Sequence, residues 1–195
     1  TFTGGRFNPR DRDLAEVTQG LDATEPDGLP IVLPLRDMHA PAPDVATALL
    51  ITDEDCRIED FDLSGLNVCV TATLSCTHLR SPRAVGAMVG TFERAALADA
   101  AARLDVSPTQ LKADDPQELV NWAFACGVKQ IFTPYVTRGP LRDWLTLAEP
   151  ILAQHGITLC EQRRKWDDAI WPHATAGFFK VRKKIPRILE ETGLA

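Results

Sequence analysis

Four short apolar runs set the pattern of the chain, and they lie at residues 46–52, 66–72, 128–133 and 157–161. Each run is nearly continuous rather than alternating with polar residues, which is typical of strands that are buried on both faces of a sheet. Longer segments with helical spacing follow the second and third runs. This order predicts an α/β fold with a mostly parallel, Rossmann-like sheet and helices on both faces.

The first helical segment covers residues 81–104. Ser81 followed by Pro82 predicts the N-cap and the first helical residue. Apolar residues at helical spacing predict the face that packs on the sheet: Val85, Met88, Phe92, Ala95, Ala96 and Leu104.

Turn and capping residues mark the other helices. Asp115 predicts an N-cap, and Gly127 predicts the left-handed end of the same helix. A further helix is expected between Pro140 and Gly156. A last short helix is interrupted or restarted by Pro186.

Residues 1–45 show neither pattern and predict an extended arm or linker in front of the α/β domain at 46–195. Five prolines fall between Pro26 and Pro43. Proline removes a backbone donor and disfavours helix at the residue before it, so regular structure is not expected in the arm.

The net charge of −6 conceals an uneven distribution. Residues 1–62 carry 14 acidic and 5 basic residues, whereas residues 163–187 carry 2 acidic and 8 basic residues. The chain as a whole is therefore not a basic nucleic-acid binder, and any such surface is local to its C-terminal end. Within that end, Arg182, Lys183 and Lys184 are the predicted contacts for nucleic acid or a partner, with a solvated helix face as the alternative.

The five cysteines have irregular spacings without a C-x-x-C or paired Cys/His zinc motif. We interpret them as reduced thiols and expect a cytoplasmic protein. No apolar run reaches the roughly 18 residues of a membrane-spanning helix, so no membrane association is expected.

In a parallel sheet, ligands bind outside the carboxyl ends of the strands. Polar residues follow three of the predicted strands, and they are the predicted ligand-binding residues: Thr52, Asp53, Ser75, His78, Thr133, Tyr135 and Arg138. The sequence lacks a phosphate-binding glycine loop, so the ligand is not specified by a motif.

Three alternative chemistries are weighed against simpler interpretations. The acids after the first strand, Asp53 to Asp55, offer hard oxygens for a divalent cation, but neighbouring residues face opposite sides, which favours a solvated loop. Ser75 and His78 lack the spacing of a catalytic triad. Trp166 and Trp171 suit base stacking or electron transfer, but large aromatic residues more often anchor a core or an interface.

Residues 128–189 resemble the end of the α/β domain of photolyases and cryptochromes, in particular the bacterial photolyase-like branch. A strand leads to a loop with Tyr135 and Arg138, and a helix follows. The sequence Gly156-Ile157-Thr158-Leu159 then occupies the place of the family's next strand. The sequence Gly177-Phe178-Phe179-Lys180-Val181 occupies the place of its exit segment.

The resemblance implies a module of a flavoprotein that serves light-dependent DNA repair or photoreception. The family's N-terminal signature and its helical flavin-binding region are absent from the sequence. FAD, the helical domain that holds it and contact with DNA would therefore lie outside this chain, which would not be catalytic alone. An antenna chromophore is a further implied cofactor. An independent nucleotide-binding α/β enzyme and a non-enzymatic interaction module remain as alternatives.

Overall fold

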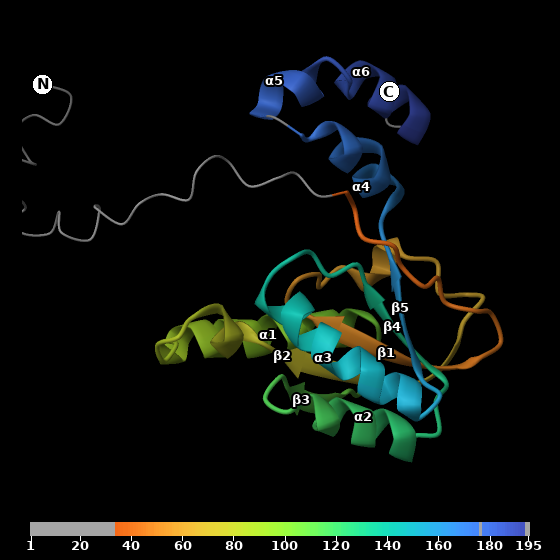
Figure 1. Cartoon of the computed structure of the whole chain (residues 1–195), viewed down its shortest axis with the longest axis vertical. Helices are drawn as coiled ribbons and strands as arrows, with labels where there is room; N and C mark the ends of the chain where they lie inside the picture. The colour runs from red at the N-terminus through yellow and green to blue at the C-terminus, as the bar shows by residue number, and fades with distance from the viewer. Residues whose placement is uncertain (1–33, 176, 194–195) are drawn as a thin grey trace, which may run out of the picture. The chain divides into compact units, whose positions relative to one another are not determined.

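The computed structural model describes residues 34–175 and 177–193. Its centre is a five-stranded sheet in the order β3-β2-β1-β4-β5, and every neighbouring pair is parallel (Figure 1). The strands are β1 (Ala46–Thr52), β2 (Asn67–Ser75), β3 (Thr109–Lys112), β4 (Gln130–Pro134) and β5 (Thr158–Gln162). The predicted α/β, Rossmann-like fold is confirmed.

Helices connect the strands and form the C-terminal segment. The connecting helices are α1 (Ala87–Arg103), α2 (Pro116–Ala125) and α3 (Pro140–Gln154). The helices after β5 are α4 (Lys165–Ile170), α5 (Gly177–Arg182) and α6 (Ile185–Thr192). Single turns of 3₁₀ helix lie at η3 (Ile58–Asp60), η4 (Thr77–Arg80) and η5 (Trp171–His173). None of the helices in the described ranges has the length and apolarity that a membrane span requires.

Local capping signals place the ends of α2 and α3 correctly. The Asp115 side chain accepts a hydrogen bond from the backbone N–H of Gln117, as an N-cap residue does. Gly127 and Gly156 follow the two helices at φ of 70° and 68°, a region that glycine enters without strain from a Cβ atom.

The core lies on both faces of the sheet because successive residues of β1 point to opposite sides. Ala48 and Leu50 pack in a cluster with residues of α2 and α3. Leu49 and Ile51 pack in a second cluster with residues of α1 and with Phe132 of β4. Figure 1 shows α2 and α3 together on one side of the sheet.

The first predicted helix differs from the structure in its start and in its buried face. The helix begins at Ala87 rather than after Ser81, because the Ser81 hydroxyl accepts a hydrogen bond from the Arg83 backbone in a turn. Met88 and Phe92 were predicted to be buried but are 87% and 75% exposed. The buried residues of α1 are Glu93, Leu97, Ala100 and Ala101.

Residues 35–45 have no helix or strand but belong to the same compact unit as the sheet, which begins at Leu35. The backbone carbonyl of His39 accepts a hydrogen bond from the Glu161 backbone, and the Gln130 side chain bonds both backbone groups of Ala42. The end of the predicted arm is thus held against β4 and β5. The prediction of an extended arm at residues 1–33 lies outside the described residues.

Candidate functional site

The carboxyl ends of β1 and β4 are neighbours at the point where the chain changes direction across the sheet. From β1 the chain adds β2 and β3 on one side, and it then returns to add β4 and β5 on the other side. Loops that leave neighbouring strands in opposite directions open a crevice, the usual ligand position in this class of fold. The predicted site residues lie along this edge of the sheet.

Several of the predicted residues are enclosed or already engaged. Thr52 and Thr133 are almost completely buried. The Ser75 hydroxyl donates to the Leu111 carbonyl on the neighbouring strand. His78 Nε2 lies 3.2 Å from the Ala113 carbonyl oxygen and 3.0 Å from Asp114 Oδ1, so it joins η4 to the loop after β3. Ser75 and His78 therefore contact different residues. The Ser–His hydrogen bond of a catalytic triad is not found between them.

Tyr135 is a contact point between the end of β4 and the segment after β5. The guanidinium groups of Arg36 and Arg163 lie 4.7 Å and 4.9 Å from its ring centre. Trp171 packs against the same ring with centroids 5.6 Å apart. The contacts of Trp171 agree with its interpretation as an anchor residue. Arg138, three residues after Tyr135, is exposed.

A buried ion pair lies beside Tyr135. Glu161 at the end of β5 is 3% exposed, and its carboxylate accepts hydrogen bonds from both terminal nitrogens of Arg36 at 2.5 and 2.8 Å. The same carboxylate accepts from the Val136 backbone and lies 3.4 Å from the Arg142 guanidinium. Glu161 therefore ties residue 36, the loop after β4 and α3 to the end of β5.

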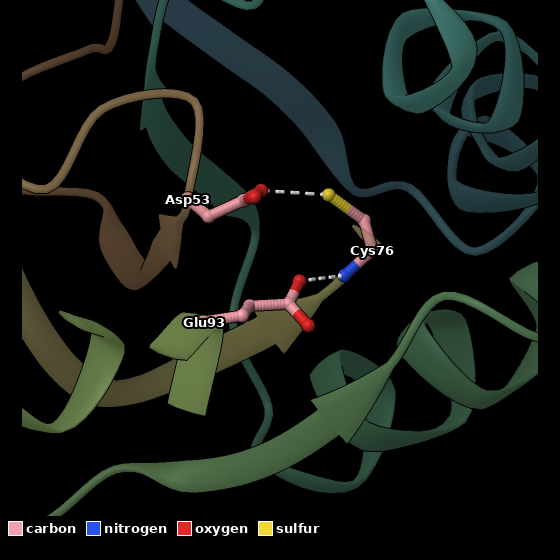
Figure 2. Close-up of side chains that lie close together, drawn as sticks. All are labelled: Asp53, Cys76 and Glu93. Atoms are coloured by element: carbon pink, nitrogen blue, oxygen red, sulfur yellow. Dashed lines mark hydrogen bonds between the residues drawn. The ribbon is translucent and has the colours of Figure 1, made fainter. Parts of the chain in front are cut away.

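Asp53 contacts two residues that were not among the predicted site residues. The Cys76 thiol donates to Asp53 Oδ1 at an S–O distance of 2.8 Å, and Arg80 lies 2.9 Å from Oδ2. Glu93 reaches the same place from α1, where Oε1 accepts from the backbone N–H groups of Cys76 and Thr77 at 2.5 and 2.8 Å. Figure 2 shows the Asp53 carboxylate directed at the Cys76 sulfur and the Glu93 carboxylate directed at the Cys76 backbone nitrogen. We call Asp53, Cys76 and Glu93 the Cys76 cluster.

The surroundings of Cys76 determine its protonation. Burial, followed by the hydrogen bond and negative charge of Asp53, raises the pKa of the Cys76 thiol far above its ordinary value. The thiol is therefore a hydrogen-bond donor at neutral pH and not a nucleophilic thiolate. A bound cation would reverse this balance, because a coordinated thiol loses its proton.

The sequence pattern did not indicate Glu93 as a site residue, because a different face of its helix was predicted to pack on the sheet. A buried carboxylate in an alanine-rich helix is unusual, since charged residues are rarely enclosed without a partner. The sequence does contain a signal for Glu93. Residues 93, 97, 100 and 101 have the spacing of one helical face, and Glu93 is the one acidic residue on it. Nothing in the local pattern around Cys76 indicated that it faces both acids.

The basic C-terminal end is exposed. Arg182, Lys183 and Lys184 all lie at the surface, and Phe178 and Phe179 of α5 are 62% and 74% exposed. Phe179, Lys183 and Lys184 line a hollow of about 390 Å³ together with residues around η5. This surface combines apolar and positively charged groups.

Neither the known protein-family models nor the curated proteins give a significant match to the sequence.

Proposed function

We propose that this chain is the α/β domain of a photolyase- or cryptochrome-like flavoprotein that serves light-dependent DNA repair or photoreception. The observation that carries the proposal is the order of elements over residues 128–189. β4 ends at the loop with Tyr135 and Arg138, and α3 with Gly156 leads into β5. The sequence that occupies the place of the family's exit segment, Gly177 to Val181, follows as part of α5.

The exposed aromatic residues of α5 support a docking role for this domain. Phe178 and Phe179 leave large apolar surfaces in water, which is typical of contact sites for another domain or chain. In the proposal this surface contacts the helical flavin-binding domain, which holds FAD. Arg182, Lys183 and Lys184 lie beside it and are available to DNA phosphates or an acidic partner segment.

Further parts of the proposal concern the sheet edge and the compartment. An antenna chromophore would lie at the carboxyl ends of the strands, where parallel sheets bind ligands. The five cysteines are free, which fits a reducing, cytoplasmic setting.

The full-length protein that contains this chain is expected to purify with FAD and to reverse thymine dimers under blue light but not in the dark. Absorbance of the purified protein and assay of irradiated DNA measure the two properties. The matched control is this chain expressed alone, which we expect to be colourless because the flavin lies in the other domain. A full-length protein that is colourless and free of flavin would contradict the proposal.

The strand order favours a second candidate function, nucleotide binding by this chain alone at the carboxyl ends of β1 and β4. Nucleotide at about 100 times its Kd stabilises a folded protein by about 2.7 kcal/mol. In a chain of this size, that raises the Tm by roughly 5–10 °C. Thermal unfolding with a panel of nucleotides measures the shift. Arg138→Ala should reduce it, whereas Arg83→Ala, at an exposed position before α1, should not. No shift with any nucleotide argues against this candidate.

A further inference from the structure

Three side chains from separate parts of the fold bring metal-ligating atoms to one place at the sheet edge. Asp53 follows β1, Cys76 follows β2, and Glu93 lies on α1 (Figure 2). One ligand atom of each lies within 4.8 Å of the others. We propose that Asp53, Cys76 and Glu93 bind one Zn²⁺ ion. The proposal rests on these residues alone and is independent of the proposed flavoprotein role.

A zinc ion requires a small rearrangement of the cluster. With Zn–S and Zn–O bonds of about 2.3 and 2.0 Å and tetrahedral angles, ligand atoms lie roughly 3.3–3.5 Å apart. The Cys76 sulfur and Asp53 Oδ1 are closer than this, at 2.8 Å, because they share a proton, and the three ligand atoms all lie within 4.8 Å of one another. Zinc would therefore replace the hydrogen bond between Cys76 and Asp53, and the ligand atoms would move by roughly 1 Å to reach these separations.

The kind of donor selects the metal. One sulfur with two carboxylates is a mixed soft and hard donor set, which suits Zn²⁺. Mg²⁺ and Ca²⁺ bind through oxygen and gain little from a thiol. Binding forms a Zn–S bond and releases the Cys76 proton to solvent, so neither an oxidant nor a reductant takes part.

A separate observation at Thr77 also points to a ligand here. Among the described residues, Thr77 Oγ1 is one of two buried side-chain polar atoms without a hydrogen-bond partner, and Thr77 is 7% exposed. A buried hydroxyl without a partner is costly, so its position needs an explanation such as an ion or a water molecule. Thr77, Asp53 and Glu93 line the same cavity of about 160 Å³.

Glu93 keeps one carboxylate oxygen for the metal. Its Oε1 is held by the two backbone N–H groups at the start of η4. Within the described part of the chain, no hydrogen bond to Oε2 is found. Three protein ligands leave a fourth zinc position, and the cavity beside Thr77 has room for a water molecule there.

The site carries an excess of negative charge, which favours a cation. Arg80 is shared between Asp53 and Glu54, at 2.9 and 3.0 Å. With a protonated Cys76, the carboxylates of Asp53, Glu54 and Glu93 and the single Arg80 leave two net negative charges. Zn²⁺ adds two positive charges while the thiol loses one proton, so one negative charge remains, and less uncompensated charge is favoured where burial weakens its solvation.

Co²⁺ titration of the whole metal-stripped chain tests the proposal, because Co²⁺ reports on its ligands by absorbance. We expect one Co²⁺ per chain, visible bands of tetrahedral cobalt and a near-ultraviolet thiolate-to-cobalt band, all removed by stoichiometric Zn²⁺. Cys76→Ser should abolish the thiolate band. Loss of residues that merely support a ligand weakens metal binding about 10–100-fold, so Asp53→Asn and Glu93→Gln should weaken it by at least about 100-fold.

Cys126→Ser and Cys69→Ser are the matched controls, because both cysteines are exposed; Cys126 follows α2, and Cys69 lies near the start of β2, whereas Cys76 follows the end of that strand. They should leave the titration unchanged. If Cys76→Ser fails to fold, Glu93→Gln provides the test, since its amide oxygen still accepts from the two backbone N–H groups. A thiolate band that survives in Cys76→Ser, an absent band in the unmodified chain, or full competition by Mg²⁺ would each overturn the proposal.

Discussion

Replacement of Phe132 by alanine is expected to lower the free energy of unfolding by about 4 kcal/mol, because phenylalanine-to-alanine changes in cores cost roughly 3–5 kcal/mol. Phe132 lies in β4 and is completely buried. Its ring packs edge-to-face on Phe61 with centroids 6.0 Å apart. Alanine would remove this contact and leave a cavity under α1 that the surrounding strands cannot close. Denaturant unfolding measures the change in stability.

Phe178→Ala is the matched control for this prediction. Phe178 is 62% exposed on α5, and surface changes of this kind usually alter stability by about 0.5 kcal/mol or less. Both variants replace phenylalanine by alanine, so the difference in their stability measures the effect of burial at Phe132. A Phe132→Ala variant that is no less stable than Phe178→Ala would mean that Phe132 is not enclosed as described.

The second large effect is expected at Glu161, whose replacement by alanine should cost about 3 kcal/mol. Removal of one partner from a buried ion pair typically costs about 3–5 kcal/mol, since the remaining charge is left enclosed. Arg142 is 6% exposed and would lose one of its two acidic partners, keeping Glu149 at 2.6 Å and the Thr146 hydroxyl. Arg36 is partly exposed and can be solvated after the change, which places the expected cost at the lower end. Denaturant unfolding again measures the loss.

Glu191→Ala is the control, because Glu191 pairs with Arg187 on the exposed surface of α6. Exposed pairs contribute roughly 0–1 kcal/mol, so this variant should be nearly as stable as the unmodified chain. Equal stability of the Glu161 and Glu191 variants would show that the Glu161 pair is solvated.

The fold class followed from the sequence because β1 and β4 are buried along almost their whole length, and β2 and β5 are buried over part of theirs. Such strands are continuous apolar runs, which stand out from the helices between them. β3 was not predicted because it has four residues at the edge of the sheet and is mostly exposed. An exposed edge strand needs no apolar side chains, so the pattern contains no signal for it.

The orientation of α1 illustrates a different limit of pattern analysis. Small apolar residues surround this helix on most sides, so several faces fit a core equally well by spacing alone. Burial of Ala100 and Ala101 lets the helix approach the sheet closely. The hydrogen bonds that Glu93 accepts from backbone N–H groups at the start of η4 then fix the rotation of the helix. Both reasons depend on contacts between separate elements.

The candidate site was predicted in part. Asp53 and Tyr135 follow strands, and the rule for carboxyl ends of parallel strands selects such residues from sequence alone. The rule cannot select Cys76 and Glu93 as the partners of Asp53, because that choice depends on the strand register and on the face that α1 presents. The same holds for Arg36 and Glu161, which are 125 residues apart in the chain.

Burial patterns and capping residues, which act within a few positions of the chain, were enough to predict the fold class, four of the strands and the ends of α2 and α3. The Cys76 cluster, the Glu161 ion pair and the rotation of α1 depend on how the elements pack together. These features join residues that are distant in the chain. Their contacts arise only when parallel strands align their carboxyl ends and helices pack across them, and no local pattern encodes that alignment.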